Sequence, residues 1–184
     1  MIDLGVTFHA MLAAVRGAQT ADDAWKEVVV VAGQMGVVIP DDLRQVSAEA
    51  EVQIIAGQVR TIVERNPIPP SVTFLYFGLF AAVRLGSDEE AAGFYVAGGS
   101  SRDAEPTIDR PKDLVYSPLG RYLESPLLDR VKAEALRAGE DYNSYDYALM
   151  FGAAAIPAKF ATRKLGLLQT LLVGFDSGDR AVIT

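Results

Sequence analysis

The sequence contains no cysteine and only one histidine, His9. The absence of cysteine excludes disulfide bonds, zinc–cysteine sites and a cysteine nucleophile, and a single histidine excludes any site that needs two. His9 follows Phe8 in a segment with helical periodicity, and no nucleophile, acid or pocket is marked beside it. We therefore expect a structural or solvent-facing role for His9, and we identify no catalytic residue, metal site or cofactor.

A long uncharged hydrophobic run is also missing. The longest, residues 72–83, is shorter than the roughly 20 residues that a membrane-spanning helix needs, and residues 148–175 are interrupted by Pro157 and three basic side chains. No basic segment precedes an apolar run at the start of the chain, so we expect no signal peptide. Together with the absence of cysteine, these observations predict a soluble cytoplasmic protein with no membrane partner.

Basic side chains are in deficit, because 17 lysines and arginines stand against 24 aspartates and glutamates. The formal net charge is −7 and the calculated pI is about 4.7, which disfavours nucleic acid as a partner, since general binders need a dense positive surface. Residues 1–92 carry 12 acidic and 6 basic side chains, so the first half is the better candidate for an acidic surface. Such a surface can steer a basic partner, or it can be a solvated face without one.

Apolar material is plentiful, since half of the 184 residues are hydrophobic, and this suffices for a packed core. We predict an α+β fold that is predominantly helical, with a small antiparallel sheet that includes a C-terminal hairpin. We treat residues 1–184 as a single domain. The polar, turn-rich residues 98–117 are a candidate flexible or functional loop between a helical half (1–97) and an α+β half (118–184).

Apolar periodicity and capping residues define the predicted helices. Residues 72–85 are hydrophobic on nearly every face, which is typical of a helix buried at the centre of a domain. Pro157 should kink or restart the last helix. The predicted helices cover residues 4–16, about 21–35, 40–65, 72–85, 118–124, 126–138 and about 144–164.

The C-terminus changes to a strand-like pattern. Residues 166–175 and 180–184 are apolar and flank a turn-forming tetrapeptide from Asp176 to Asp179, which is the strongest hairpin signal in the chain. Because one hairpin alone is only marginally stable, we expect residues 93–97 or another extended segment to supply a third strand. The two aspartates could approach a hard cation, but hairpin-turn chemistry explains them more simply.

The most suggestive segment for recognition is residues 140–147, where three tyrosines are interleaved with three acids. We take Asp141, Tyr142, Tyr145 and Asp146 as a candidate partner surface, because tyrosine brings a large area and a hydroxyl to interfaces and acids favour a basic partner. The alternative is that one tyrosine enters the core, an acid or an asparagine caps a helix, and the other side chains form ordinary surface.

A weaker candidate follows the predicted strand at 93–97. Gly98, Gly99, Ser100 and Arg102 could bind an anion with backbone amides, a hydroxyl and a guanidinium. The segment lacks a GxGxxG motif, a Walker lysine and a clear helix start, so a mobile turn is the favoured interpretation.

Three basic residues, Lys159, Arg163 and Lys164, form the densest basic cluster. They could bind an anion, but cations near the end of a helix are favoured without any ligand, and we prefer that explanation.

Three functional classes stay open. The first is a small acidic interaction protein that binds a protein partner, of which an inhibitor or toxin-neutralising immunity protein is one form, suggested by size, charge and missing catalytic groups alone. The second is a small-molecule binder or enzyme that uses carboxylate or tyrosine chemistry in a pocket. The third is a homo-oligomeric assembly subunit. We favour the first class, without enzymatic activity.

Overall fold

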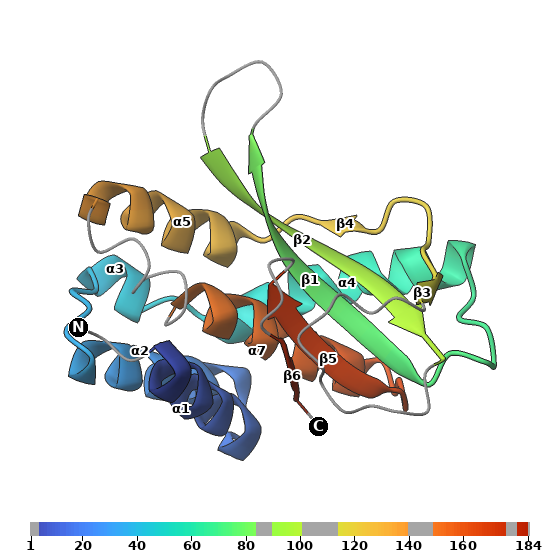
Figure 1. Cartoon of the computed structure of the whole chain (residues 1–184), viewed down its shortest axis with the longest axis horizontal. Coiled ribbons are helices and arrows are strands. Elements are labelled where there is room, and N and C mark those ends of the chain that lie inside the picture. The colour runs from blue at the N-terminus through green and yellow to red at the C-terminus, as the bar shows by residue number, and fades with distance from the viewer. Residues whose placement is uncertain (1–3, 84–89, 101–113, 140–148, 176–179, 184) are drawn as a thin grey trace.

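The computed structural model of the chain describes residues 4–83, 90–100, 114–139, 149–175 and 180–183. Within these residues, helices pack against one face of a six-stranded sheet (Figure 1). The elements in chain order are α1 (Leu4–Gly17), α2 (Ala21–Gln34), α3 (Asp41–Arg44), α4 (Ala48–Arg65), β1 (Phe74–Val83), β2 (Glu90–Gly99), β3 (Leu114–Tyr116), β4 (Tyr122–Leu123), α5 (Pro126–Ala138), α7 (Phe151–Lys164), β5 (Thr170–Phe175) and β6 (Arg180–Val182). The predicted α+β class, rich in helix, is therefore confirmed.

The sheet is built around β1. It pairs antiparallel with β2 along the full length of both strands and parallel with β5, and the strand order is β3-β2-β1-β5-β6, with β4 also pairing with β2. The parallel pair makes the sheet mixed, which corrects the prediction of an antiparallel sheet. β5 and β6 pair antiparallel, so the C-terminal hairpin is confirmed, although its turn at residues 176–179 lies outside the described residues.

The central strand was predicted as a helix, and that prediction was wrong. β1 lies within the segment 72–85, and most of the side chains on both of its faces are apolar and buried. No alternation of apolar and polar residues therefore marks it as a strand. Phe77 and Leu79 belong to the core beneath the helices, whereas Phe74 and Tyr76 form a smaller cluster on the opposite face. Residues 93–97 do lie in a strand, β2, but β1 separates them from the hairpin.

Local capping signals located the starts of α2 and α5 correctly. The side chain of Thr20 accepts a hydrogen bond from the Asp23 amide at the start of α2, and Ser125 accepts one from the Leu128 amide at the start of α5. Gly139 then ends α5 with a positive φ.

Three predicted helices differ in the structure. The predicted helix 40–65 is two helices, because Ser47 adopts an extended conformation and caps α4 as a new start. The predicted helix 118–124 is a turn followed by β4, with Gly120 at a positive φ. α7 begins at Phe151 and continues through Pro157 without a restart, while a kink at Pro157, the other expected outcome, stays a prediction.

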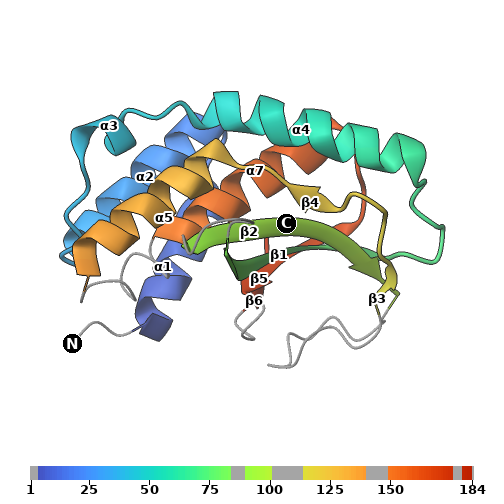
Figure 2. The same ribbon diagram turned by 90° about the horizontal axis from the view of Figure 1, so that it is seen from above.

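One layer of helices covers the sheet on one side. Seen from above, α4, α5 and α7 lie along that side, and no described helix lies over the opposite face (Figure 2). The main core fills the space between these helices and the sheet. Among the residues that the structure describes, no helix is both long enough and apolar enough to cross a membrane.

Candidate functional site

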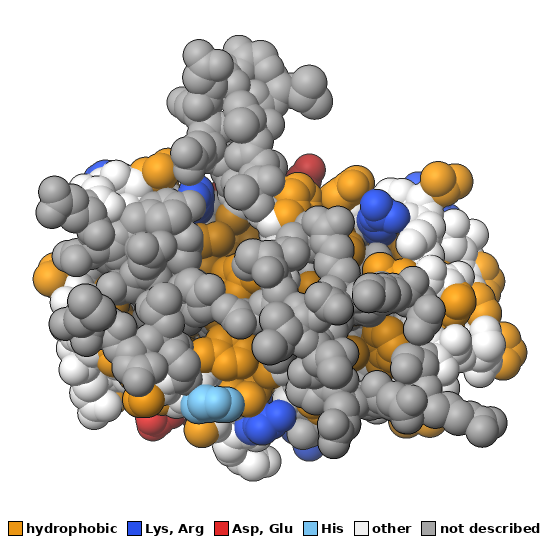
Figure 3. Space-filling view, viewed as in Figure 1, with side chains coloured by type: hydrophobic (Ala, Val, Ile, Leu, Met, Phe, Trp, Pro, Cys, Tyr) orange, Lys and Arg blue, Asp and Glu red, His pale blue; other side chains and the backbone are white. Residues whose placement is uncertain are grey.

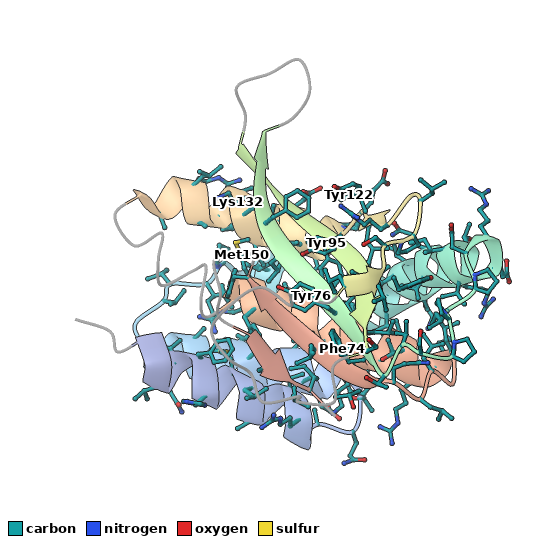
Figure 4. The ribbon with its side chains drawn as sticks, turned by 45° about the vertical axis from the view of Figure 1, so that its right-hand side comes forward. Phe74, Tyr76, Tyr95, Tyr122, Lys132 and Met150 are labelled. Atoms are coloured by element: carbon teal, nitrogen blue, oxygen red, sulfur yellow. The ribbon has the colours of Figure 1, made fainter. Side chains whose placement is uncertain are left out.

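The sheet face that the helices leave uncovered carries a row of aromatic rings. Side chains alternate along β1, so Phe74, Tyr76 and Phe80 share this face. The pairing of β1 with β2 and of β2 with β4 then adds two tyrosines, Tyr95 opposite Gly78 and Tyr122 opposite Tyr95. Figure 4 shows Phe74, Tyr76, Tyr95 and Tyr122 following one another across the strands.

We call Tyr76, Phe80, Tyr95 and Tyr122 the aromatic cluster. The ring centroids of Tyr76 and Tyr95 are 5.8 Å apart, those of Phe80 and Tyr95 are 5.9 Å apart, and those of Phe80 and Tyr122 are 5.6 Å apart. These separations and the tilted or edge-to-face angles are the geometry in which aromatic pairs attract one another beyond simple burial. The rings therefore hold one another in place.

Two glycines make room for this arrangement. A Cβ atom at Gly78 would lie 2.4 Å from the Tyr95 ring, and a Cβ atom at Gly93 would lie 2.0 Å from the Phe80 ring. Both rings lie across a neighbouring strand where a side chain would normally stand, so a side chain at either glycine would force the ring or the strand to shift.

One cation lies within the aromatic cluster. The guanidinium carbon of Arg121 is 5.4 Å from the ring centroid of Tyr122 and 5.7 Å from that of Tyr95, which is cation–π distance. Its Nη2 donates a long hydrogen bond of 3.5 Å to the Tyr122 hydroxyl, and its buried Nε has no acceptor. No described carboxylate forms an ion pair with Arg121.

Exposure increases along the row. Phe74 and Tyr76 are buried, Phe80 and Tyr95 are partly exposed, and Tyr122 is 60% exposed. On the same face, Figure 3 shows hydrophobic side chains gathered over the centre of the sheet, with few described acidic side chains in view. The outer end of the aromatic cluster is thus a solvent-accessible surface of tyrosine, phenylalanine and arginine.

A second feature is a groove of about 320 Å³ between α3, α4 and α5. Its apolar lining includes Val46, Ile54 and Leu127, and Asp42 and Arg130 form an ion pair of 2.9 Å among the lining residues. The lining also includes Glu51, which is only 3% exposed. A buried acid beside apolar residues fits the carboxylate chemistry of the small-molecule hypothesis.

The carboxylate of Glu51 is occupied by the fold itself. Its Oε1 accepts a hydrogen bond of 2.5 Å from the Ser125 hydroxyl, and its Oε2 accepts one of 3.2 Å from the Leu127 amide. These bonds join α4 to the beginning of α5. Burial raises the pKa of Glu51, while the hydrogen bonds from Ser125 and Leu127 oppose that shift.

The predicted tyrosine-and-acid surface falls outside the part of the chain that the structure describes. Asp141, Tyr142, Tyr145 and Asp146 all lie in residues 140–148, so they stay a prediction.

The predicted anion site is only partly described. Gly98 and Gly99 are the last residues of β2, Ser100 follows them, and Arg102 lies outside the described residues. A Cβ atom at Gly98 would lie 2.7 Å from Val72 Cγ1, so close packing gives this glycine a structural reason. Anion binding here also stays a prediction.

The basic cluster of Lys159, Arg163 and Lys164 in α7 has a structural explanation. The Lys159 ammonium donates hydrogen bonds to the carbonyls of Val15, Arg16 and Ala18, at 2.8, 3.0 and 3.1 Å, and so caps the C-terminal end of α1. Arg163 and Lys164 lie in the last turn of their own helix, α7, where cations are favoured. His9 is exposed on α1, and Asp176 and Asp179 lie outside the described residues.

In the described part of the chain, no group of three or more His, Asp or Glu side chains could hold a metal ion. Comparisons with protein families, with curated proteins and with solved structures find no match to this chain. The function must therefore be inferred from the surfaces described above.

Sequence reasoning missed the aromatic cluster because it assigned β1 to a helix. A usable signal was present in the abundance of aromatic residues in this segment, which favour strands. The approach of Tyr122 and Arg121 was not predictable in this way, because it depends on the pairing of β4 with β2.

Proposed function

We propose that this protein acts by binding a protein partner through the exposed end of the aromatic cluster. Tyrosine, phenylalanine and arginine are enriched at the centres of protein interfaces, where a few such residues supply most of the binding energy. The observation that carries the proposal is Tyr122, 60% exposed, held against Phe80, Tyr95 and Arg121. Because neighbouring rings already restrict it, little conformational entropy is lost when a partner covers it.

The groove supports the small-molecule alternative less well. Both oxygens of Glu51 accept hydrogen bonds from the start of α5, and these bonds account for the buried carboxylate without a ligand. The oligomer alternative relied in part on the apolar area of the helix predicted at residues 72–85, and β1 occupies residues 74–83 of that segment instead. We propose that the interaction takes place in the cytoplasm, because the chain has no cysteine. Binding through the aromatic cluster can inhibit the partner.

Site-specific cross-linking in the native host tests the proposal. The photoreactive residue benzoylphenylalanine replaces Tyr122 in one variant and Leu168 in the control, because Leu168 is 95% exposed and lies between α7 and β5. After irradiation, we expect a discrete protein adduct at position 122 and none at position 168. Absence of an adduct at position 122, or the same adducts at both positions, would argue against binding through the aromatic cluster.

Affinity for the captured partner provides the quantitative test. Tyr122→Ala is expected to weaken binding about tenfold or more, as truncation of a central interface tyrosine does. Leu168→Ala removes a more exposed apolar side chain away from the aromatic cluster and should leave the Kd unchanged. Equal affinities of the two variants would contradict the proposal.

A further inference from the structure

Arg121 brings a positive charge to the aromatic cluster, where the described residues offer it no opposite charge. Its guanidinium lies over two tyrosine rings, its Nε is buried without an acceptor, and no described carboxylate is within ion-pair distance. Its side-chain hydrogen bond to the Tyr122 hydroxyl is long at 3.5 Å. Ring contacts therefore hold the guanidinium in place, while no described carboxylate neutralises its charge.

A guanidinium in this setting favours an anionic neighbour. Partial removal from water weakens the hydration of the charge, and the aromatic rings replace only part of it. A carboxylate brought against Arg121 would form charge-assisted hydrogen bonds, which are stronger than neutral ones. A second cation approaching the same tyrosine rings would instead be repelled by Arg121.

The net charge of the described residues does not oppose this preference at the aromatic cluster. The residues that the structure describes carry 12 acidic and 13 basic side chains, so the excess of acid in the sequence comes from segments outside them. The basic partner suggested by the overall charge of −7 has no matching acidic group in the aromatic cluster.

We infer that the partner segment bound by the aromatic cluster carries an aspartate or glutamate beside an apolar or aromatic side chain. The acid pairs with Arg121, and the apolar side chain packs on Phe80 and Tyr122. This inference rests on the proposed function, because it specifies the chemistry of the protein segment bound at the same surface. It replaces, for this surface, the expectation of a basic partner.

A peptide selection tests the inference without knowledge of the partner. A phage-displayed library of random linear peptides is selected in parallel on the full chain, on Arg121→Gln and on Arg60→Gln, an exposed arginine of α4 that serves as the control. We expect the full chain and Arg60→Gln to enrich peptides with Asp or Glu next to Leu, Phe, Trp or Tyr. Arg121→Gln should lose these peptides.

Affinities of the selected peptides then give the magnitude. A synthetic peptide from the selection should bind Arg121→Gln at least tenfold more weakly than the unmodified chain, and binding to the unmodified chain should weaken as salt is added. Replacing the acid of the peptide by its amide should cause a similar loss on the unmodified chain. This arm needs no protein variant and so remains decisive if Arg121→Gln fails to fold.

The outcomes separate the inference from the proposed function. Three results would overturn the inference that the bound segment is acidic. They are enrichment of Lys- or Arg-rich peptides, equal binding of acidic peptides to Arg121→Gln and the unmodified chain, and no enrichment at all. If one of these results is found together with a cross-linked adduct at position 122, the proposed function still stands. If that adduct is absent, both the proposed function and the acidic-segment inference are rejected.

Discussion

Glu51 is the residue whose environment differs most from what its chemistry would suggest. A glutamate is rarely buried without a partner, and here the carboxylate accepts hydrogen bonds from the Ser125 hydroxyl and the Leu127 amide. The sequence pattern of α4 gave no reason to single it out, because the partners come from α5, far along the chain. Its role in this structure is to fix the beginning of α5 against α4.

Removal of this carboxylate should destabilise the fold. Glu51→Ala leaves the Leu127 amide without its acceptor and the Ser125 hydroxyl without its partner, so we expect a loss of about 2–3 kcal/mol in the free energy of unfolding. Glu64→Ala, at an exposed position of the same helix, is the control and should change stability by less than about 0.5 kcal/mol. Urea unfolding measures both, and equal stabilities would refute the capping role.

Stability should also depend on pH through Glu51. Because burial raises its pKa above the ordinary value of 4.5, the folded state binds more protons than the unfolded state between that value and the raised one. This contribution favours folding fully below 4.5 and is lost as the pH rises through the raised pKa. Glu51→Gln cannot titrate, so the stability of the unmodified chain relative to this variant should increase as the pH falls through that window. A difference independent of pH would contradict the assignment.

At the scale of elements, prediction succeeded where the signal is local. Thr20 and Ser125 mark helix starts by side-chain bonds to amides three residues ahead, so the sequence alone locates them. β1 could not be located by an alternation of apolar and polar residues. Phe77 faces the helices and Tyr76 belongs to the aromatic cluster on the opposite face, yet both side chains are buried. The aromatic cluster itself depends on pairings between strands distant in sequence, which no local pattern encodes.

The glycines of the sheet provide the test at this scale. Gly93→Ala places a Cβ atom where the Phe80 ring lies, so the ring must move or the strands must separate, and we expect a loss of about 1–3 kcal/mol. Gly57→Ala in α4 is the matched control, because nothing lies within 4 Å of its added Cβ, and it should gain up to about 1 kcal/mol from helix propensity. Urea unfolding of both variants checks the opposite signs. A neutral Gly93→Ala would show that the close approach of Phe80 is not required.

At the scale of the whole molecule, contacts distant in sequence join the N-terminal helices to the C-terminal segment. β1 pairs with β5, the Lys159 ammonium of α7 caps the end of α1, and the Arg16 side chain of α1 donates a hydrogen bond to the Val182 carbonyl of β6. A boundary at residues 98–117 would leave these contacts to hold two separate bodies together. We predict instead that these contacts make the chain one cooperative unit, in which loss of one contact weakens every element.

Lys159→Met tests this cooperativity, because it keeps an apolar side chain of similar length and removes the ammonium. Three carbonyls at the end of α1 then lose their donor, and we expect a loss of about 1–3 kcal/mol in the free energy of unfolding.

Two probes follow the unfolding. Trp25, the only tryptophan, reports on α2 by fluorescence, and far-UV circular dichroism reports on all elements. Both unfolding transitions should coincide and should shift to lower urea together. Lys26→Met, at an exposed position of α2, should shift neither by more than about 0.5 kcal/mol. If the fluorescence transition alone moved, the N-terminal helices would unfold independently of the sheet, and the parallel β1–β5 pair would not couple the two ends of the chain.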